Sequence, residues 1–336
     1  VGDAGCAEHG SRLEDRLIDT LIAVRVLHFT ATVTLVGAVV FQFHVAAPLL
    51  RSASDAAGRY CLARFTRWIW WISLALAVAS GAAWLVVLTA QITGDPVAAA
   101  LPDAATLLVQ TQFGNVAGLR LAIALLLAAV LQWHQLLGGL RWLALGLALC
   151  FAGSLAWTGH SGAGDGVAGD AAAAADALHV IAASAWIGGL APLAYVFTLA
   201  SRPATSLTPA EVAGVTRRFS NLGVVCVATL LITGIINAWF IVRSVAILLG
   251  SSYGQLLMIK VALFFVMVGI AAINRTWLTP KLTASALDAR AKAARRLARN
   301  SLIEAGLGLA ILALVGALGT LPPELTDDHH MHSHTH

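Results

Sequence analysis

Long apolar runs separated by short polar segments dominate the pattern of this chain. Eight runs are long enough to cross about 30 Å of hydrocarbon as a helix of roughly 20 residues. They cover residues 19–47, 67–92, 114–134, 141–158, 175–199, 219–242, 254–275 and 300–320. None alternates polar and apolar positions as a membrane β-strand would, so each backbone must satisfy its hydrogen bonds within a helix. The pattern predicts an all-α, polytopic membrane bundle of eight transmembrane helices.

Composition and charge add an orientation to this picture. Hydrophobic residues make up 59% of the chain and charged residues 11%, with a mean hydropathy of +0.81, which excludes an ordinary soluble domain. Basic residues gather in segments 51–67, 135–141, 201–218 and 275–299. By the positive-inside rule these segments face the cytoplasm, so both termini lie on the outer side. No basic stripe with interleaved aromatic residues indicates a nucleic-acid partner, and no intact signal peptide is expected before the first span.

The two halves of the chain resemble each other. The first span contains RVLHFTATVTLVG and the fifth contains DALHVIAASAWIG. Each places a glycine nine residues after a Leu-His pair, from His28 to Gly37 and from His179 to Gly188. Four spans in each half predict a parallel repeat about an axis along the membrane normal. The alternative is chance similarity between helices rich in Leu and Ala.

Two further pairs of spans support the repeat. TQFGNVAGLR opens the third span and SSYGQLLMIK the seventh, so that Arg120 matches Lys260, and Ser-Gly at 80–81 matches Thr-Gly at 233–234. The predicted organisation has five parts. They are an outer N-terminal segment (1–18), the first four-helix repeat (19–158), a Gly-rich outer loop (159–174), the second four-helix repeat (175–320) and a His-rich outer tail (321–336).

Polar residues inside the spans are the candidates for function. A charge at mid-depth costs roughly 2.5–3.5 kcal/mol on insertion, so each such residue needs a reason. His28, Asp176 and His179 fall at a similar depth in the outer half of the bilayer, and His160 ends the fourth span at that level. Asp176 and His179 share a helix face. Imidazole and carboxylate donors together suit copper or zinc, so the sequence predicts a metal site of these four residues.

Other polar positions have secondary roles in this prediction. Asn237 is placed beside the site or along an ion path, and Asn274 lies deeper. Arg120 and Lys260 either reach outward to lipid headgroups or line an outer vestibule. A single membrane histidine is more often a hydrogen-bond partner of another helix than a ligand, and for each histidine alone this alternative stays open. The tail adds possible capture residues, namely His329, His330, His332, His334 and His336.

These motifs resemble the copper-resistance D (CopD) family of inner-membrane proteins. The resemblance rests on Leu27-His28, Gly159-His160, DALHVIAASAWIGGLAPL, RFSNLG, TGIINAW and YGQLLMIK through INR, and it covers most of residues 15–320. It implies a role in copper handling, usually import across the cytoplasmic membrane alongside a periplasmic copper-binding partner. The outer side is then the periplasm, and the ion is copper.

The donor set and the missing motifs narrow the function. Only three methionines are present, so a Met-lined path for Cu(I) is not expected. Delivery as Cu(II), or capture by histidine followed by reduction, fits the donors better. The main hypothesis is copper transport by an outer His/Asp site. The alternatives are a b-type cytochrome with His28 and His179 as axial ligands of one haem, and a membrane subunit that passes copper to an enzyme without transporting it. No nucleophile–base pair, phosphate-binding loop or dinucleotide motif occurs, so no enzyme is expected. The sequence does not indicate an oligomeric state.

Overall fold

The computed structural model describes residues 2–51, 56–133, 139–158, 166–202, 207–241 and 251–321. Every regular element within these residues is helical. They are α1 (Gly2–Val40), η1 (Phe41–Val45), α2 (Ala47–Arg51), α3 (Ala56–Thr93), α4 (Leu101–Gln110), α5 (Gln112–Trp133), α6 (Leu140–Gly153), η2 (Ser154–Thr158), α7 (Gly166–Ile187), α8 (Leu190–Ala200), α9 (Pro209–Ile241), α11 (Ser252–Ile273), η4 (Asn274–Leu278), η5 (Thr279–Thr283) and α12 (Leu287–Leu318).

The eight predicted spans each overlap one of eight helical segments that are long and apolar enough to cross a membrane. In the described residues these segments are Asp15–Val45, Ala56–Thr93, Gln112–Trp133, Leu140–Thr158, Gly169–Ala200, Pro209–Trp239, Ser252–Thr283 and Leu287–Leu318. The prediction of an all-α polytopic bundle is therefore confirmed. Several helices run past their apolar stretch, since a helix already nucleated adds one backbone hydrogen bond for each further residue.

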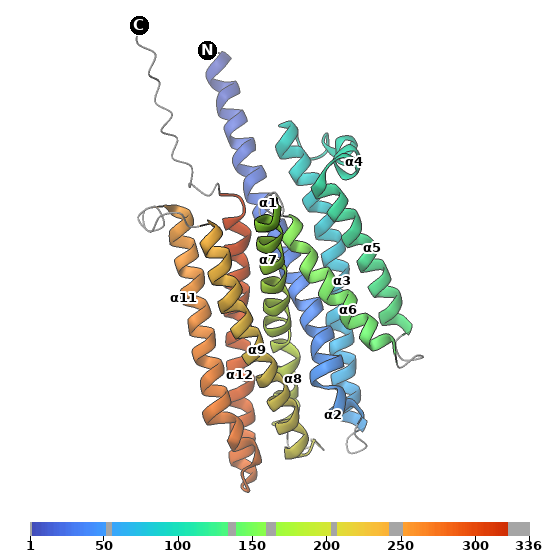
Figure 1. Cartoon of the computed structure of the whole chain (residues 1–336), viewed down its shortest axis with the longest axis vertical. Coiled ribbons are helices and arrows are strands. Elements are labelled where there is room, and N and C mark those ends of the chain that lie inside the picture. The colour runs from blue at the N-terminus through green and yellow to red at the C-terminus, as the bar shows by residue number, and fades with distance from the viewer. Residues whose placement is uncertain are drawn as a thin grey trace.

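The ends of the chain's helices separate into two sets (Figure 1). The start of α1, the short helix α4 and the end of α12 lie at one end of the bundle, and α2, the end of α8 and the start of α12 lie at the other. The first span thus begins, and the last span ends, at the same end of the bundle, as an even number of spans requires. The second end carries the described residues of the basic segments, and its assignment to the cytoplasmic side stays a prediction of the positive-inside rule.

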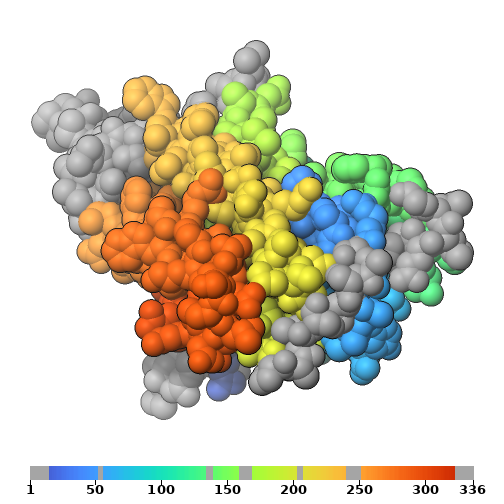
Figure 2. Space-filling model, turned by 90° about the horizontal axis from the view of Figure 1, so that it is seen from below, coloured from blue at the N-terminus to red at the C-terminus, as the bar shows by residue number. Residues whose placement is uncertain are grey.

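The helices pack in the same way in both halves. In the first half α1 packs against α3 and α6, and α5 packs against α6; in the second half α7 packs against α9, α8 against α12, and α11 against α12. The two halves meet where α1 contacts α7 and α12, and also where α6 contacts α7 and α3 contacts α8. Seen from the end where α12 starts, the first half (blue to green) and the second half (yellow to orange) lie side by side (Figure 2). These pairings are consistent with a four-plus-four repeat, which stays a prediction.

The fifth span is broken at the centre of the bundle. The sequence predicts one helix over 175–199, whereas α7 ends at Ile187 and α8 begins at Leu190. Gly188 touches Gly37 of α1 here: a Cβ on Gly37 would lie 2.2 Å from the carbonyl carbon of Gly188, and one on Gly188 would lie 2.0 Å from the carbonyl oxygen of Val33. Two backbones can approach this closely only where neither carries a side chain. The two glycines that follow the matched Leu-His pairs therefore form one close backbone contact between the halves.

The surface around the sides of the bundle is apolar along the spans. Large side chains on α11 are exposed, among them Val261, Phe265 and Val266 at 44–56% exposed. In water such a surface would be an aggregation hazard, but lipid chains cover it at no cost. The buried polar residues described below are therefore the ones that need an explanation.

Candidate metal centre

His28 lies on α1 and is almost completely buried, at 3% exposed. Its Nδ1 is 3.1 Å from the Ser80 hydroxyl of α3, and its Nε2 is 3.0 Å from a guanidinium nitrogen of Arg120 on α5. The Ser80 hydroxyl donates to the carbonyl of Leu76 at 2.6 Å, so it accepts from Nδ1. A guanidinium only donates, so Nε2 accepts. His28 is thus a neutral imidazole with both nitrogens engaged.

Arg120 is held entirely inside the first half. It is 5% exposed and donates to the carbonyl of Phe151 and to the hydroxyl of Ser154, each at 2.7 Å. Its guanidinium lies 4.3 Å from the centre of the Phe151 ring. Of the two roles that the sequence left open, neither applies, because this side chain reaches neither the headgroups nor an outer vestibule. It fixes His28 instead.

His179 on α7 occupies the matching place in the second half. Its Nδ1 is 2.9 Å from the Thr233 hydroxyl of α9, which itself donates to the carbonyl of Thr229 at 2.7 Å. The hydroxyl therefore accepts from Nδ1, and the lone pair of His179 is on Nε2. Within the described residues no hydrogen bond occupies Nε2. Lys260 of α11 is close enough to interact electrostatically with the ring.

Asp176 completes a polar cluster one turn before His179. Asn237 of α9 donates to its Oδ1 at 3.4 Å, and the carboxylate interacts electrostatically with Lys260 and Tyr253 of α11. We call Asp176, His179, Asn237, Tyr253 and Lys260 the second-half cluster. It combines an imidazole lone pair with a carboxylate, which is the donor pair that a borderline metal ion such as Cu(II) binds.

The first half differs at the positions that matter for this chemistry. Three residues before the histidine, Arg25 stands where the second half has Asp176, and four residues after the matched hydroxyl, Trp84 stands where it has Asn237. The Arg25 guanidinium lies 5.1 Å from the centre of the Trp84 ring, and that ring packs edge-on against His28 at 5.6 Å. A cation and an aromatic wall replace the carboxylate. The first half therefore lacks the donors of the second.

The structure brings some of the predicted site residues together and separates others. Asp176, His179 and Asn237 meet in the second-half cluster, whereas the hydrogen-bond partners of His28 belong to the first half. His160 and the tail histidines lie outside the described residues. Among the side chains that are described, no three from His, Cys, Asp and Glu are close enough to hold one metal ion. The predicted four-residue site stays a prediction.

Asn274 has partners that sequence reasoning missed. Its amide donates to the Glu304 carboxylate at 2.7 Å and accepts from the Asn300 amide at 2.7 Å. Glu304 is 2% exposed, and it lies four residues after Asn300, on the same face of α12. The four-residue spacing of Asn300 and Glu304 was the sequence signal that could have predicted a polar cluster on this face of α12. Asn274 joins α11 to α12 rather than extending the cluster around His179.

The positions of His28 and His179 do not support the alternative of a haem bound between them. Ligation of one haem by two histidines requires a free Nε2 on each ring, facing the same iron. Nε2 of His28 accepts a hydrogen bond from Arg120, and a haem could bind there only if Arg120 moved away.

The fold, with one buried and one partly buried polar cluster, defines a polytopic membrane protein with a histidine centre in each half. The family model described as Copper resistance protein D-like, N-terminal domain, matches residues 16–170, and that described as Copper resistance protein D matches residues 213–318. The chain belongs to the copper-resistance D family, and the resemblance found in its motifs is confirmed. It is a multi-pass inner-membrane protein.

Three curated relatives carry the same similarity. The chain is 35% identical over 154 residues to copper resistance protein D of Pseudomonas syringae pv. tomato, covering 45% of this chain and 49% of that protein. It is 31% identical over 147 residues to copper transport protein CutJ of Bacillus subtilis, covering 44% and 25%, and 29% identical over 165 residues to inner membrane protein YebZ of Escherichia coli, covering 49% and 54%. The similarity spans about half of these relatives' length or less.

Proposed function

We propose that this protein binds copper and carries it across the inner membrane, with Nε2 of His179 and the Asp176 carboxylate as the core of the binding site. The names of two relatives, a copper resistance protein and a copper transport protein, support the choice of ion. The observation that carries the proposal is the lone pair of His179, which is unshared within the described residues and lies one helical turn from a carboxylate.

The neighbours of these two side chains have roles in holding them. Thr233 fixes the ring by accepting from Nδ1, which leaves Nε2 for the ion, as the second hydrogen bond of a metal-binding histidine does in known sites. Asn237 orients the carboxylate. Lys260 supplies a positive charge in the absence of the ion, and entering copper displaces it from Asp176. His160, which precedes α7, is the proposed third ligand.

His28 has a different role in this proposal. A metal ion reaches its Nε2 only after breaking the bond from Arg120, so we assign His28 to the structural centre of the first half. The other three predicted ligands, His160, Asp176 and His179, remain in the proposed site. The two halves then hold a histidine in similar surroundings, but only the second half has a carboxylate, Asp176, three residues before it.

Import is the proposed direction, from a periplasmic copper-binding protein to the cytoplasm. The positive-inside rule places the second-half cluster toward the outer side, where a delivered ion arrives first. Transport without catalysis is proposed because the hydroxyls of Ser80 and Thr233 donate to helix carbonyls and accept from the histidines, so neither imidazole acts on them as a base. Copper flux into proteoliposomes separates this function from the delivery of copper to an enzyme.

The test uses the chain without residues 322–336, so that the tail histidines do not bind copper themselves. Equilibrium copper binding is measured for His179→Ala, Asp176→Asn and His28→Ala. The matched control is His44→Ala, since His44 is exposed and lies in η1, at the opposite end of the bundle. The first two changes are expected to weaken binding at least about tenfold, whereas His28→Ala and His44→Ala leave it unchanged.

Two results would overturn the assignment. Unchanged copper binding in His179→Ala removes the site, and equal weakening in His44→Ala shows non-specific binding. An absorption spectrum of the same purified protein checks the other class of function, because a Soret band that disappears in His179→Ala identifies a haem protein.

A further inference from the structure

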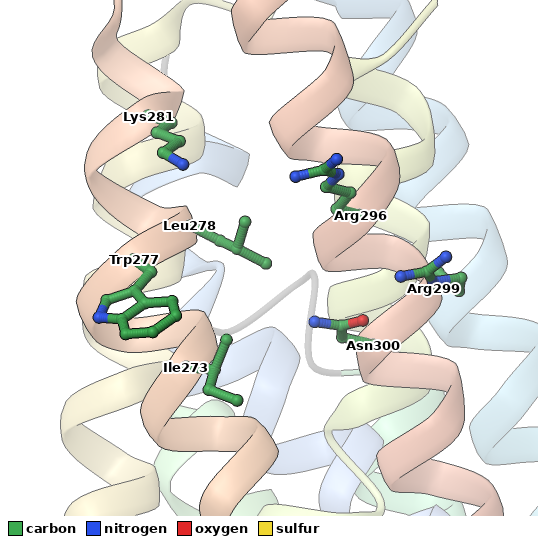
Figure 3. A pocket seen from close by; sticks show the side chains of 7 residues that line it. All are labelled: Ile273, Trp277, Leu278, Lys281, Arg296, Arg299 and Asn300. Carbon is green, nitrogen blue, oxygen red and sulfur yellow. The ribbon is translucent and has the colours of Figure 1, made fainter.

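A pocket of about 310 Å³ opens between the end of α11 and the start of α12, at the end of the bundle opposite the second-half cluster. It is lined by Ile273, Trp277, Leu278, Lys281, Arg296, Arg299 and Asn300 (Figure 3). Three of these side chains are basic and none is acidic. The pocket is unrelated to the copper proposal and has no role in it.

The basic side chains come from both walls of the pocket. Lys281 belongs to η5, and Arg296 and Arg299 lie one turn apart on α12; Lys281 and Arg296 extend toward each other from the facing helices (Figure 3). Within the described part of the chain, none of the three is paired with a carboxylate. Three unpaired cations facing one space repel each other, so an anion between them is stabilised.

The wall toward the middle of the membrane is apolar. Ile273 is 45% exposed and Trp277, one turn further along, is 69% exposed. Lys281 follows at the next turn in sequence. One wall of the pocket thus changes from aliphatic to aromatic to basic in the order in which a lipid leaflet changes from acyl chain to interface to phosphate.

The floor of the pocket is fixed. Asn300 donates to Asn274, and Asn274 donates to Glu304, so the two walls are tied together by hydrogen bonds below the basic side chains. A pocket with a rigid floor loses little freedom when a ligand binds.

We propose that this pocket binds the phosphate of an anionic phospholipid, with Lys281, Arg296 and Arg299 around the phosphate and the acyl chains along Ile273 and Trp277. Free inorganic phosphate has the same charge chemistry but no use for the apolar wall. The lipid belongs to the leaflet that the positive-inside rule assigns to the cytoplasmic side, where a basic pocket between helices is a known type of headgroup site.

The test is native mass spectrometry of the full chain in detergent, titrated with phosphatidylglycerol, phosphatidylcholine or inorganic phosphate. Arg296→Gln with Arg299→Gln removes two charges from the pocket. Arg290→Gln with Arg295→Gln removes two charges from the same helix outside the pocket and is the matched control. Wild type and control are expected to bind phosphatidylglycerol in preference to phosphatidylcholine, and the pocket variant is expected to bind it at least about tenfold more weakly.

Each other outcome counts against the proposal. Equal weakening in both double variants shows general charge attraction, and equal binding of phosphatidylcholine shows no selection for the anion. If inorganic phosphate binds as tightly as phosphatidylglycerol and displaces it, the site is one for small anions and the lipid assignment fails. A melting curve for each variant checks that it remains folded.

Discussion

Nε2 of His28 lies 3.0 Å from a guanidinium nitrogen of Arg120, and both side chains are at most 5% exposed. In the second half, Lys260 interacts electrostatically with the histidine at the matching position, and within the described residues Nε2 of His179 has no hydrogen bond. Two histidines at matching positions of two similar helices therefore differ. Nε2 is hydrogen-bonded in the first half, and within the described residues it is free to bind a ligand in the second. The halves also differ in the base near the histidine, which is an arginine in the first half and a lysine in the second.

Arg120→Lys is expected to destabilise the protein, although it keeps the charge. The guanidinium binds His28, the Phe151 carbonyl and the Ser154 hydroxyl at once, and a lysine ammonium is a point donor that does not span all three. Loss of one or two of these buried charged bonds is expected to lower the free energy of unfolding by about 2 kcal/mol. Thermal unfolding in detergent measures it. Arg295→Lys, on the exposed face of α12, is the control, and an equal shift in both variants contradicts the prediction.

Gly37→Ala is expected to disrupt the junction between the halves. The new Cβ would lie 2.2 Å from the backbone of Gly188, and backbone has no rotamer into which it can move aside. We expect a loss of at least about 2 kcal/mol in unfolding free energy. Gly146→Ala in α6 provides the comparison, because nothing lies within 4 Å of a Cβ there. A melting temperature for Gly37→Ala at or above that of Gly146→Ala would show that the contact is not close.

Asn274→Leu is expected to leave a buried carboxylate and a partly buried amide without their partner. The Glu304 carboxylate loses a donor and the Asn300 amide loses an acceptor, each worth about 1–3 kcal/mol when unsatisfied. Asn115→Leu, on the exposed face of α5, is the control. Adding Glu304→Leu to Asn274→Leu removes the buried carboxylate and is expected to recover part of the stability. No recovery in the double variant would mean that the bond between Asn274 and Glu304 carries no coupling.

Deletion of residues 327–336 is expected to slow copper uptake at limiting copper and to leave it unchanged at saturating copper. In the proposed function, five tethered histidines would raise the local concentration of the ion without forming the transport site. Uptake into proteoliposomes over a range of copper concentrations measures the effect, with the five histidines replaced by serine as a control for tail length. Uptake abolished at saturating copper would place the essential ligands in the tail.

Several features of the site were predictable from the pattern of residues. Asp176 and His179, three apart in one span, share a helix face, and they do lie in one cluster with Asn237. The role of Arg120 was not predictable. The two roles considered for it followed from its depth in the membrane, whereas its actual role depends on its contact with His28. Nor was the partner of Asn274 predictable, since Glu304 approaches it only through the packing of α12 on α11.

The sequence by itself determined that this chain crosses a membrane eight times as helices, because each span carries enough apolar surface to partition into lipid and must form its own backbone hydrogen bonds. It also determined which helix face each polar residue occupies, since that depends only on local spacing. Only the tertiary structure decided which histidine is engaged and which is available. Ser80 and Arg120, the partners of His28, lie 52 and 92 residues away in the chain, and the packing of separate helices brings them to the ring. No local pattern encodes a contact over that separation.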